Sequence, residues 1–350
     1  MPIGEDDPPD GRQLPHRDEV HAWQMPHLGL PDFSFCTFMA EHVSRHPFRA
    51  ERLAVRGQQL QILHWGDPAE ATDAVPLTVM VHGWMDVAAS YQFLVDALRA
   101  QPGWGARPLL ALDWRGFGGS YLASGPAPDG DYAYVDYLAD LDAVLDRVSP
   151  GRAVNLIGHS MGGNVVMLYA GARPGRIRRL VNLEGVGLPV AAPEEAPRRL
   201  AAWLDGLKAP VALKDYDSVA AVAARLRQNN PRLTPERAQW LAGHWAHEAG
   251  GRWHINADPA HKRPGPHLYR LEEVLATWRA ITAPTLVVEG ADTAVYQFFN
   301  GRHTRDDFLQ RVAVLQNATH RVLPDASHML HHDQPEAVAL EIETLLAETA

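Results

Sequence analysis

The feature that most constrains this chain is the pentapeptide Gly-His-Ser-Met-Gly at residues 158–162, which stands between an apolar run and a stretch with helical spacing. Residues 152–157 read as a short buried strand, and residues 163–172 read as a helix rich in small residues. A serine with a glycine two positions away on each side, on a strand-to-helix turn, is the pattern of a nucleophile elbow. We therefore predict that Ser160 is a nucleophile, held in strained backbone geometry with its Oγ exposed.

A serine hydroxyl is a poor nucleophile by itself and needs a base that accepts its proton. In chains with this elbow the histidine comes late in the sequence, after the acid. The strand read from residues 321–324 ends shortly before His328, and we predict that His328 is the base. His331 and His332 follow closely, and we interpret them as surface or supporting residues.

Two carboxylates compete for the role of orienting the imidazole. Asp292 follows the apolar strand read from residues 284–289, whereas Glu184 follows an earlier strand, residues 180–183. Either strand end could direct a carboxylate to the Nδ1–H group of the histidine. Asp292 is favoured because the later strand is the usual donor in this topology, and Glu184 is kept as the alternative acid.

An oxyanion that forms during acyl transfer needs two backbone N–H groups aimed at it. One is expected from Met161, directly after the nucleophile, and the other from Trp84 in the loop after the strand at residues 77–81. Gly83 would let the backbone approach the substrate closely. His82 is expected to brace this loop through hydrogen bonds rather than to transfer protons.

Strands and helices alternate from about residue 49, which predicts an α/β fold with a mostly parallel central sheet and helices on both faces. Catalytic groups would then lie at the carboxyl ends of the strands. The strands are expected at residues 53–55, 60–65, 77–81, 109–113, 154–158, 180–183, 284–289 and 321–324.

Residues 188–279 break this alternation, and their helical patterns predict a cap inserted between two strands of the sheet. The helices of the cap are expected at residues 196–207, 218–228, 235–248 and 271–279. His244 and His247 are three positions apart, but no third ligand has suitable spacing, so no metal site is predicted. The expected organisation is an N-terminal extension (1–48), an α/β core (49–187 and 280–350) and a helical cap (188–279).

Composition excludes several classes of partner. The formal net charge is −10 with no dense basic block, which argues against nucleic acid and anionic membranes. No apolar run approaches the ~18 residues that a transmembrane helix needs. The single cysteine, Cys36, excludes an internal disulfide and, with a start that does not read as a signal peptide, predicts a cytoplasmic protein. Assembly of the chain into a homo-oligomer is left open.

Taken together, these motifs resemble the α/β-hydrolases of the cap-bearing esterase, epoxide-hydrolase and haloalkane-dehalogenase lineage. The resemblance rests on the elbow and on the segments at residues 82–84, 113–120 and 327–335. Residues 183–189 and 289–292 are most similar to the serine-hydrolase-like group.

The departures from this lineage define the expected chemistry. Epoxide hydrolases and dehalogenases place aspartate at the nucleophile, whereas this chain has Ser160, which implies acyl transfer to water. Ser327 stands where the family usually has glycine. One residue fewer separates Gly290 from Asp292 than in the commonest family spacing, and for this reason Glu184 stays open as the acid.

The sequence therefore predicts a cofactor-free serine hydrolase that cleaves a carboxylic ester of a small, largely apolar molecule through an acyl-enzyme. The same groups would serve a hydrolase of carbon–carbon bonds, lactones or amides, so these remain alternatives. An alternative of another class is a protein that keeps the triad but binds a small ligand as a sensor.

Overall fold

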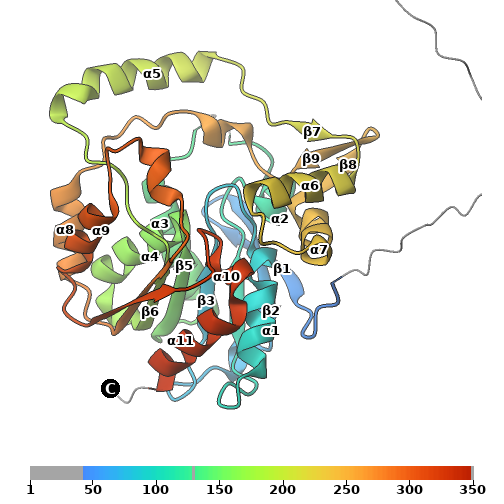
Figure 1. Cartoon of the computed structure of the whole chain (residues 1–350), viewed down its shortest axis with the longest axis vertical. Helices are drawn as coiled ribbons and strands as arrows, with labels where there is room; N and C mark the ends of the chain where they lie inside the picture. The colour runs from blue at the N-terminus through green and yellow to red at the C-terminus, as the bar shows by residue number, and fades with distance from the viewer. Residues whose placement is uncertain (1–41, 128–130, 348–350) are drawn as a thin grey trace, which may run out of the picture. The chain divides into compact units, whose positions relative to one another are not determined.

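An eight-stranded, mostly parallel sheet runs through the computed structural model, which describes residues 42–127 and 131–347 (Figure 1). The strand order is β1-β2-β4-β3-β5-β6-β10-β11. Strand β2 is antiparallel to both of its neighbours, and all pairs from β4 to β11 are parallel. The predicted α/β class with a mostly parallel sheet is confirmed.

The strands of this sheet are short and apolar at its centre, where both faces are covered. Their bounds are β1 Arg49–Val55, β2 Gln58–Trp65, β3 Thr78–Val81, β4 Leu109–Leu112, β5 Val154–His159, β6 Ile177–Leu183, β10 Thr285–Gly290 and β11 Ala318–Leu323. Every residue of β3, β4, β5 and β10 is buried, whereas β1, at the edge of the sheet, is mostly exposed.

Two groups of helices that pack on one another cover the sheet: α1, α10 and α11 form one group, and α3, α4 and α8 form the other. The α-helices are α1 Gln92–Ala100, α2 Gly118–Ser124, α3 Tyr134–Val148, α4 Met161–Ala172, α5 Ala196–Lys208, α6 Val219–Asn229, α7 Pro235–Trp245, α8 Leu271–Arg279, α9 Arg305–Val312, α10 Leu330–Asp333 and α11 Pro335–Ala347. None of the helices in the described part of the chain has the length and apolar content needed to span a lipid bilayer.

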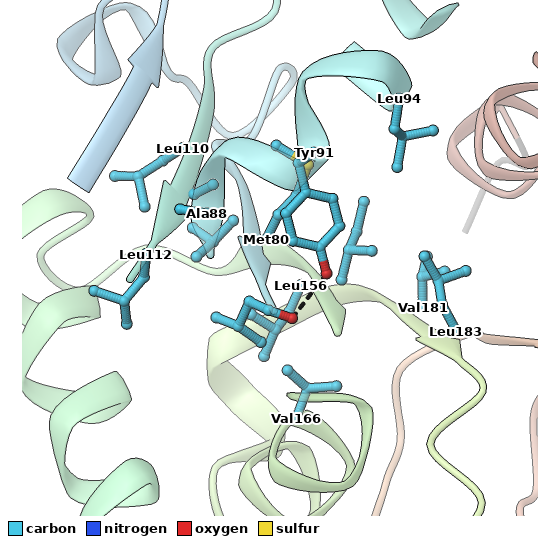
Figure 2. Close-up of a cluster of buried hydrophobic side chains, with 14 of the residues drawn as sticks. Met80, Ala88, Tyr91, Leu94, Leu110, Leu112, Leu156, Val166, Val181 and Leu183 are labelled. Atoms are coloured by element: carbon cyan, nitrogen blue, oxygen red, sulfur yellow. Dashed lines mark hydrogen bonds between the residues drawn. The ribbon is translucent and has the colours of Figure 1, made fainter. Parts of the chain in front are cut away.

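Apolar side chains from strands and helices meet in a core that also holds buried phenols, among them that of Tyr91. Figure 2 shows the Tyr91 ring among aliphatic side chains such as Met80 and Leu156. The Tyr91 hydroxyl donates to the carbonyl oxygen of Val81 at 2.8 Å, at the carboxyl end of β3. Burial raises the pKa of Tyr91, so the ring stays neutral and its one polar group is satisfied. This bond anchors the start of the loop that carries His82.

The segment between β6 and β10 contains strands as well as helices. Helices α5 to α8 are accompanied by a three-stranded antiparallel sheet of order β7-β9-β8, formed by β7 Asp215–Tyr216, β8 Ala246–Ala249 and β9 Arg252–Ile255. The helix expected at residues 235–248 therefore ends at Trp245. Gly250 and Gly251 both have positive φ, 59° and 76°, and close a two-residue hairpin. The Gly-Gly pair at residues 250–251 is the sequence signal for this hairpin.

The predicted division into extension, core and cap stays a prediction. Nearly all of the expected extension, including Cys36 and the apolar cluster near residues 33–39, lies outside the described residues. Residues 188–279, which the structure describes, lie in the sequence between β6 and β10, two neighbouring strands of the sheet.

The register of the parallel strands brings several loops to one edge of the sheet. Val81 of β3 pairs with Gly158 of β5, and His159 pairs with Leu183 of β6. Leu183 in turn pairs with Val288 of β10. The loops that follow β3, β5, β6 and β10 therefore leave the sheet side by side, and the loop after β11 joins them. All the residues expected at a catalytic site lie on these loops.

We predict that Gly171→Ala destabilises the protein, because helices α4 and α8 cross at this glycine. A Cβ there would lie 2.0 Å from the carbonyl oxygen of Thr277 in α8, so the helices would have to separate, at a cost of about 1–3 kcal/mol. The control is Gly243→Ala in α7, where a Cβ meets nothing within 4 Å and alanine should stabilise the helix by up to about 1 kcal/mol. Urea unfolding of both variants measures the difference; equal effects of the two substitutions would contradict the crossing.

Candidate active site

Ser160 occupies a sharp turn between the last residue of β5 and the first residue of α4. Its backbone is left-handed, with φ 52° and ψ −115°. Its N–H donates to the carbonyl oxygen of Leu183 at 2.8 Å, which fixes the turn against β6. An ideal Cβ on Gly158 would lie 2.4 Å from the oxygen of Gly162, and one on Gly162 would lie 2.3 Å from the oxygen of Val81. The pentapeptide thus needs both glycines, because a Cβ at either position would collide with backbone atoms.

The His328 imidazole connects the serine to a carboxylate. Its Nε2 lies 2.9 Å from Oγ of Ser160, and its Nδ1 lies 3.0 Å from Oε2 of Glu184. Because the carboxylate can only accept, we assign the ring proton to Nδ1, which leaves Nε2 to accept from the hydroxyl. The His328 side chain is 30% exposed, whereas that of Glu184 is fully buried. The structure therefore brings Ser160, His328 and Glu184 into one hydrogen-bonded chain, across 168 positions of sequence.

The Glu184 carboxylate accepts three hydrogen bonds. Besides His328, the N–H of Gly290 donates to Oε1 and the hydroxyl of Thr293 donates to Oε2, both at 2.7 Å. Glu184 has a left-handed φ of 56°, and its own N–H donates to the carbonyl of Val288. A buried carboxylate needs such partners, because no water replaces them. The acid leaves β6, but the turn after β10 holds its oxygens in place.

The structure does not bring Asp292 to the histidine, which corrects the preference stated from the sequence. Within residues 42–127 and 131–347, no hydrogen bond or ion pair joins Asp292 to His328. The Asp292 carboxylate is 49% exposed and pairs with Arg232 at 2.6 Å. The physical reason is the tight turn after β10, in which the N–H of Thr293 donates to the carbonyl oxygen of Gly290. The shortened spacing between Gly290 and Asp292 was the sequence signal for this difference.

The loop after β3 passes beside the serine. An ideal Cβ on Gly83 would lie 3.1 Å from Cβ of Ser160, so a larger residue would crowd the nucleophile. His82 is fully buried and bridges two loops: Nδ1 donates to the Gly83 carbonyl at 2.7 Å, and Nε2 accepts from the N–H of Trp114 at 3.1 Å. Burial lowers the pKa of His82 to about 3, so this imidazole stays neutral. These contacts are those expected of a residue that braces the loop.

Two amides are available for the oxyanion role predicted from the sequence. The Met161 amide is at the first position of α4, where the helix itself offers no acceptor. The Trp84 amide donates to no acceptor among the described residues. The Trp84 residue is 50% exposed, and its indole Nε1–H donates to the carbonyl oxygen of His261 at 3.3 Å. The oxyanion role of both amides remains a prediction.

Three further histidines lie behind His328. His331 and His332 are buried rather than at the surface, and His159 packs against His328 and His331 with ring centroids 4.9 and 4.5 Å apart. His159 donates through Nε2 to the His328 carbonyl at 2.8 Å, and thus fixes the backbone of the base. Burial lowers the pKa of His332 to about 4 and keeps the pKa of His159 and His331 well below the ordinary value. Sequence reasoning did not single out His159, although it directly precedes the nucleophile.

The loop that carries His328 is closed by Asp333. Its Oδ2 accepts from the N–H of Ser327 at 2.8 Å and from the Ser327 hydroxyl at 2.6 Å. Its Oδ1 accepts from the side-chain amide of Asn230 at 2.7 Å. The serine that replaces the usual glycine before the base therefore has a partner of its own.

Comparison with known proteins agrees with this geometry. Residues 78–341 match the sequence model of the alpha/beta hydrolase family, and the chain belongs to that family. The resemblance inferred from the motifs is confirmed.

Individual relatives are distant but extend over most of the chain. A serine hydrolase-like protein of Danio rerio is 25% identical over 333 residues, which cover 91% of this chain and 94% of that protein. The cis-3-alkyl-4-alkyloxetan-2-one decarboxylase of Shewanella oneidensis is 24% identical over 311 residues, which cover 87% of this chain and 90% of that protein. Among solved structures, the thioesterase domain from the curacin biosynthetic pathway has a TM-score of 0.71 at 25% identity and covers 85% of this chain and 99% of that domain.

We predict that the protein loses stability as the pH falls from 6.5 toward 4. The folded-state pKa values of His82, His261 and His332 lie below the usual 6.5, mainly because these side chains are buried. Their contribution to the free energy of unfolding is therefore present above pH 6.5 and is lost as the pH falls. Asp86 opposes this trend, because burial raises its pKa from 3.8 to about 7. Its contribution to the free energy of unfolding is therefore present at low pH and is lost as the pH rises through 7.

Asp86→Asn removes the opposing group, so the free energy of unfolding of this variant should fall more steeply with acid than that of the wild type. Urea titrations at several pH values, with EDTA present to remove divalent metal ions, measure both slopes. Asp73→Asn, at an exposed position, is the matched control and should keep the wild-type slope. Identical slopes for Asp86→Asn and the wild type would contradict the prediction.

Proposed function

We propose that this protein is a serine hydrolase that cleaves a carboxylic ester of a small, largely apolar molecule through an acyl-enzyme. The single observation that supports it best is the His328 ring, with its two nitrogens 2.9 Å from a serine hydroxyl and 3.0 Å from a buried carboxylate. Serine, imidazole and carboxylate in this connection are the parts that nucleophilic acyl transfer requires.

In the proposed reaction, Oγ of Ser160 attacks the ester carbonyl carbon while Nε2 of His328 takes the hydroxyl proton. The negative charge moves to the carbonyl oxygen, which the amides of Trp84 and Met161 would bind. His328 then protonates the departing alcohol, and the acyl group stays on Ser160. A water molecule gives its proton to His328 and attacks the acyl carbon; the carboxylic acid leaves as Ser160 regains its proton.

In this mechanism Glu184 holds the imidazole and stabilises the imidazolium that forms in each step. Its other two hydrogen bonds, from Gly290 and Thr293, come from the turn after β10 and keep the carboxylate from rotating. Because the carboxylate is buried, its charge acts on His328 with little screening by water. The reaction uses only protein groups and water, so no cofactor is invoked.

The preference for an apolar substrate rests on the loops that surround the serine. Trp84 on the loop after β3, and Leu188 and Val190 on the chain after β6, are large apolar side chains that are at least 44% exposed. Exposed apolar groups on neighbouring loops are typical of a surface that binds an apolar ligand.

We further propose that residues 188–279 act as a cap that limits the access of water to the acyl-enzyme. The support comes from their contacts with the site loops. The Trp245 indole donates to the Met85 carbonyl at 2.9 Å, and Arg237 donates to the His332 carbonyl at 3.0 Å. The bond from Trp84 to the His261 carbonyl adds a third link.

A lactone is the second candidate substrate. The Shewanella oneidensis relative is named for an oxetan-2-one, which is a four-membered cyclic ester whose carbonyl is open to the same attack. Ring opening by Ser160 would give a hydroxyacyl-enzyme and, after hydrolysis, a β-hydroxy acid.

Hydrolysis of carbon–carbon or amide bonds and a sensor role are further alternatives. Slow single turnover with a large ligand-induced rise in the melting temperature would favour the sensor. The single cysteine, Cys36, is in keeping with a cytoplasmic location.

We expect Ser160→Ala to lower the rate of p-nitrophenyl acetate hydrolysis by a factor of at least about 10³, because the nucleophile is lost. It should also abolish labelling by a fluorophosphonate probe. The control is Ser327→Ala, a neighbouring hydroxyl whose partner is Asp333, which should still be labelled. Undiminished turnover by Ser160→Ala would refute the proposed nucleophile.

Glu184→Gln and Asp292→Asn distinguish the two candidate acids. Glu184→Gln should lower kcat by a factor of about 10²–10⁴, because a neutral amide no longer stabilises the imidazolium or fixes its tautomer. Asp292→Asn breaks only an exposed ion pair with Arg232 and should keep kcat within about twofold. Steady-state kinetics with p-nitrophenyl acetate measure both, and thermal melting checks that each variant folds. The reverse order of effects would return the role to Asp292.

A further inference from the structure

Asp86, His331 and His332 form a buried cluster behind the proposed catalytic histidine. Asp86 lies on the loop after β3, and the two histidines belong to α10, which begins two residues after His328. One ligand atom from each of the three side chains lies within 4.8 Å of the other two. All three side chains are buried, at 7%, 0% and 3% exposure.

The nitrogens of this cluster lack partners. In the described part of the chain, both ring nitrogens of His331 and Nε2 of His332 are buried without a hydrogen bond. A neutral imidazole always carries one N–H donor and one acceptor nitrogen, and burial of either without a partner costs free energy. Unpaired buried polar groups of this kind call for an explanation, and an ion that the structure does not contain is one.

The carboxylate of the cluster has a partner that suits a metal ligand. The Ser90 hydroxyl donates to Oδ2 of Asp86 at 2.9 Å. Metal-bound histidines usually donate their second nitrogen to a carbonyl or carboxylate, and metal-bound carboxylates accept outer hydrogen bonds. The Ser90 hydroxyl thus orients one of the three ligands.

We propose that Asp86, His331 and His332 form a binding site for one divalent transition-metal ion of the Zn²⁺ type. Two imidazoles and a carboxylate favour such an ion over Mg²⁺ or Ca²⁺, which prefer oxygen ligands. Metal–nitrogen bonds of about 2.0 Å separate the ligand atoms of a tetrahedral site by about 3.3 Å, so modest side-chain rotation would close the cluster on the ion. Water would complete the coordination.

The position of this site gives it a structural consequence. An ion there would tie α10, which follows the His328 loop, to the loop after β3, which carries His82 and Gly83. It would occupy the layer that His159 shares with His331, whose rings are 4.5 Å apart. The site does not depend on the proposed esterase activity, because none of its three ligands takes part in the proton transfers.

The test uses the full chain, freed of metal with a chelator and titrated with Co²⁺. We expect one equivalent of Co²⁺ to develop the visible d–d absorption of a four- or five-coordinate site. Because the ligands are buried, excess EDTA should bleach this absorption slowly rather than at once. Zn²⁺ should displace Co²⁺ and raise the melting temperature of the metal-free protein.

Three variants locate the site. Asp86→Asn, which keeps the shape of the side chain, and His332→Gln should each lower the affinity for Co²⁺ at least tenfold and remove the slowly bleached absorption. The control is His254→Gln, which changes the partly exposed pair of His247 and His254 on the small sheet, with ring centroids 5.9 Å apart. This control should bind Co²⁺ as the wild type does.

Melting curves in EDTA check that the variants fold, and Asp86→Asn decides the question if His332→Gln does not fold. Absence of the d–d absorption in the wild type would overturn the proposal and leave water as the partner of the buried nitrogens. Wild-type Co²⁺ binding by folded Asp86→Asn, or loss of binding in His254→Gln, would likewise overturn it.

Discussion

The turn at Ser160 is the constraint on which the rest of the site depends. Strand β5 and helix α4 meet so closely there that the flanking positions, 158 and 162, have no room for a Cβ. The same turn forces a positive φ on the serine, whose hydroxyl lies 2.9 Å from Nε2 of His328. Its N–H bond to the carbonyl of Leu183 ties the end of β5 to the end of β6, where the acid follows. One tight turn thus sets the position of the hydroxyl and that of its neighbours.

Three strand ends cooperate to hold the carboxylate. Glu184 leaves β6, yet its oxygens accept from Gly290 and Thr293 after β10 and from His328 after β11. The acid is therefore supplied by one strand and oriented by another. This arrangement accounts for the exposure of Asp292: the turn after β10 supplies donors to Glu184, and its own carboxylate faces Arg232.

A layer of neutral imidazoles packs behind His328. His159 holds the His328 carbonyl, while His331 and His332 are buried in α10 immediately after the loop. Burial disfavours their charged forms, so these imidazoles stay neutral beside the ring of His328. One ring nitrogen each of His331 and His332 lies within 4.8 Å of an Asp86 carboxylate oxygen, and the proposed ion would bind between them.

Local patterns in the sequence were enough to predict the α/β class, the elbow, and the loops that carry Ser160 and His328, because glycine spacing and apolar runs act within a few residues. The Gly-Gly hairpin at residues 250–251 was also visible locally, but the helical pattern before it was extended too far. The choice between Asp292 and Glu184 could not be made locally. It depends on how the turn after β10 folds against the end of β6, and only tertiary packing decides which carboxylate is buried beside the imidazole. The same holds for His331 and His332, because nothing in their sequence neighbourhood separates a surface pair from a buried one. They pack against residues that are distant in the sequence, among them Tyr91 and His159 against His331 and Phe93 against His332.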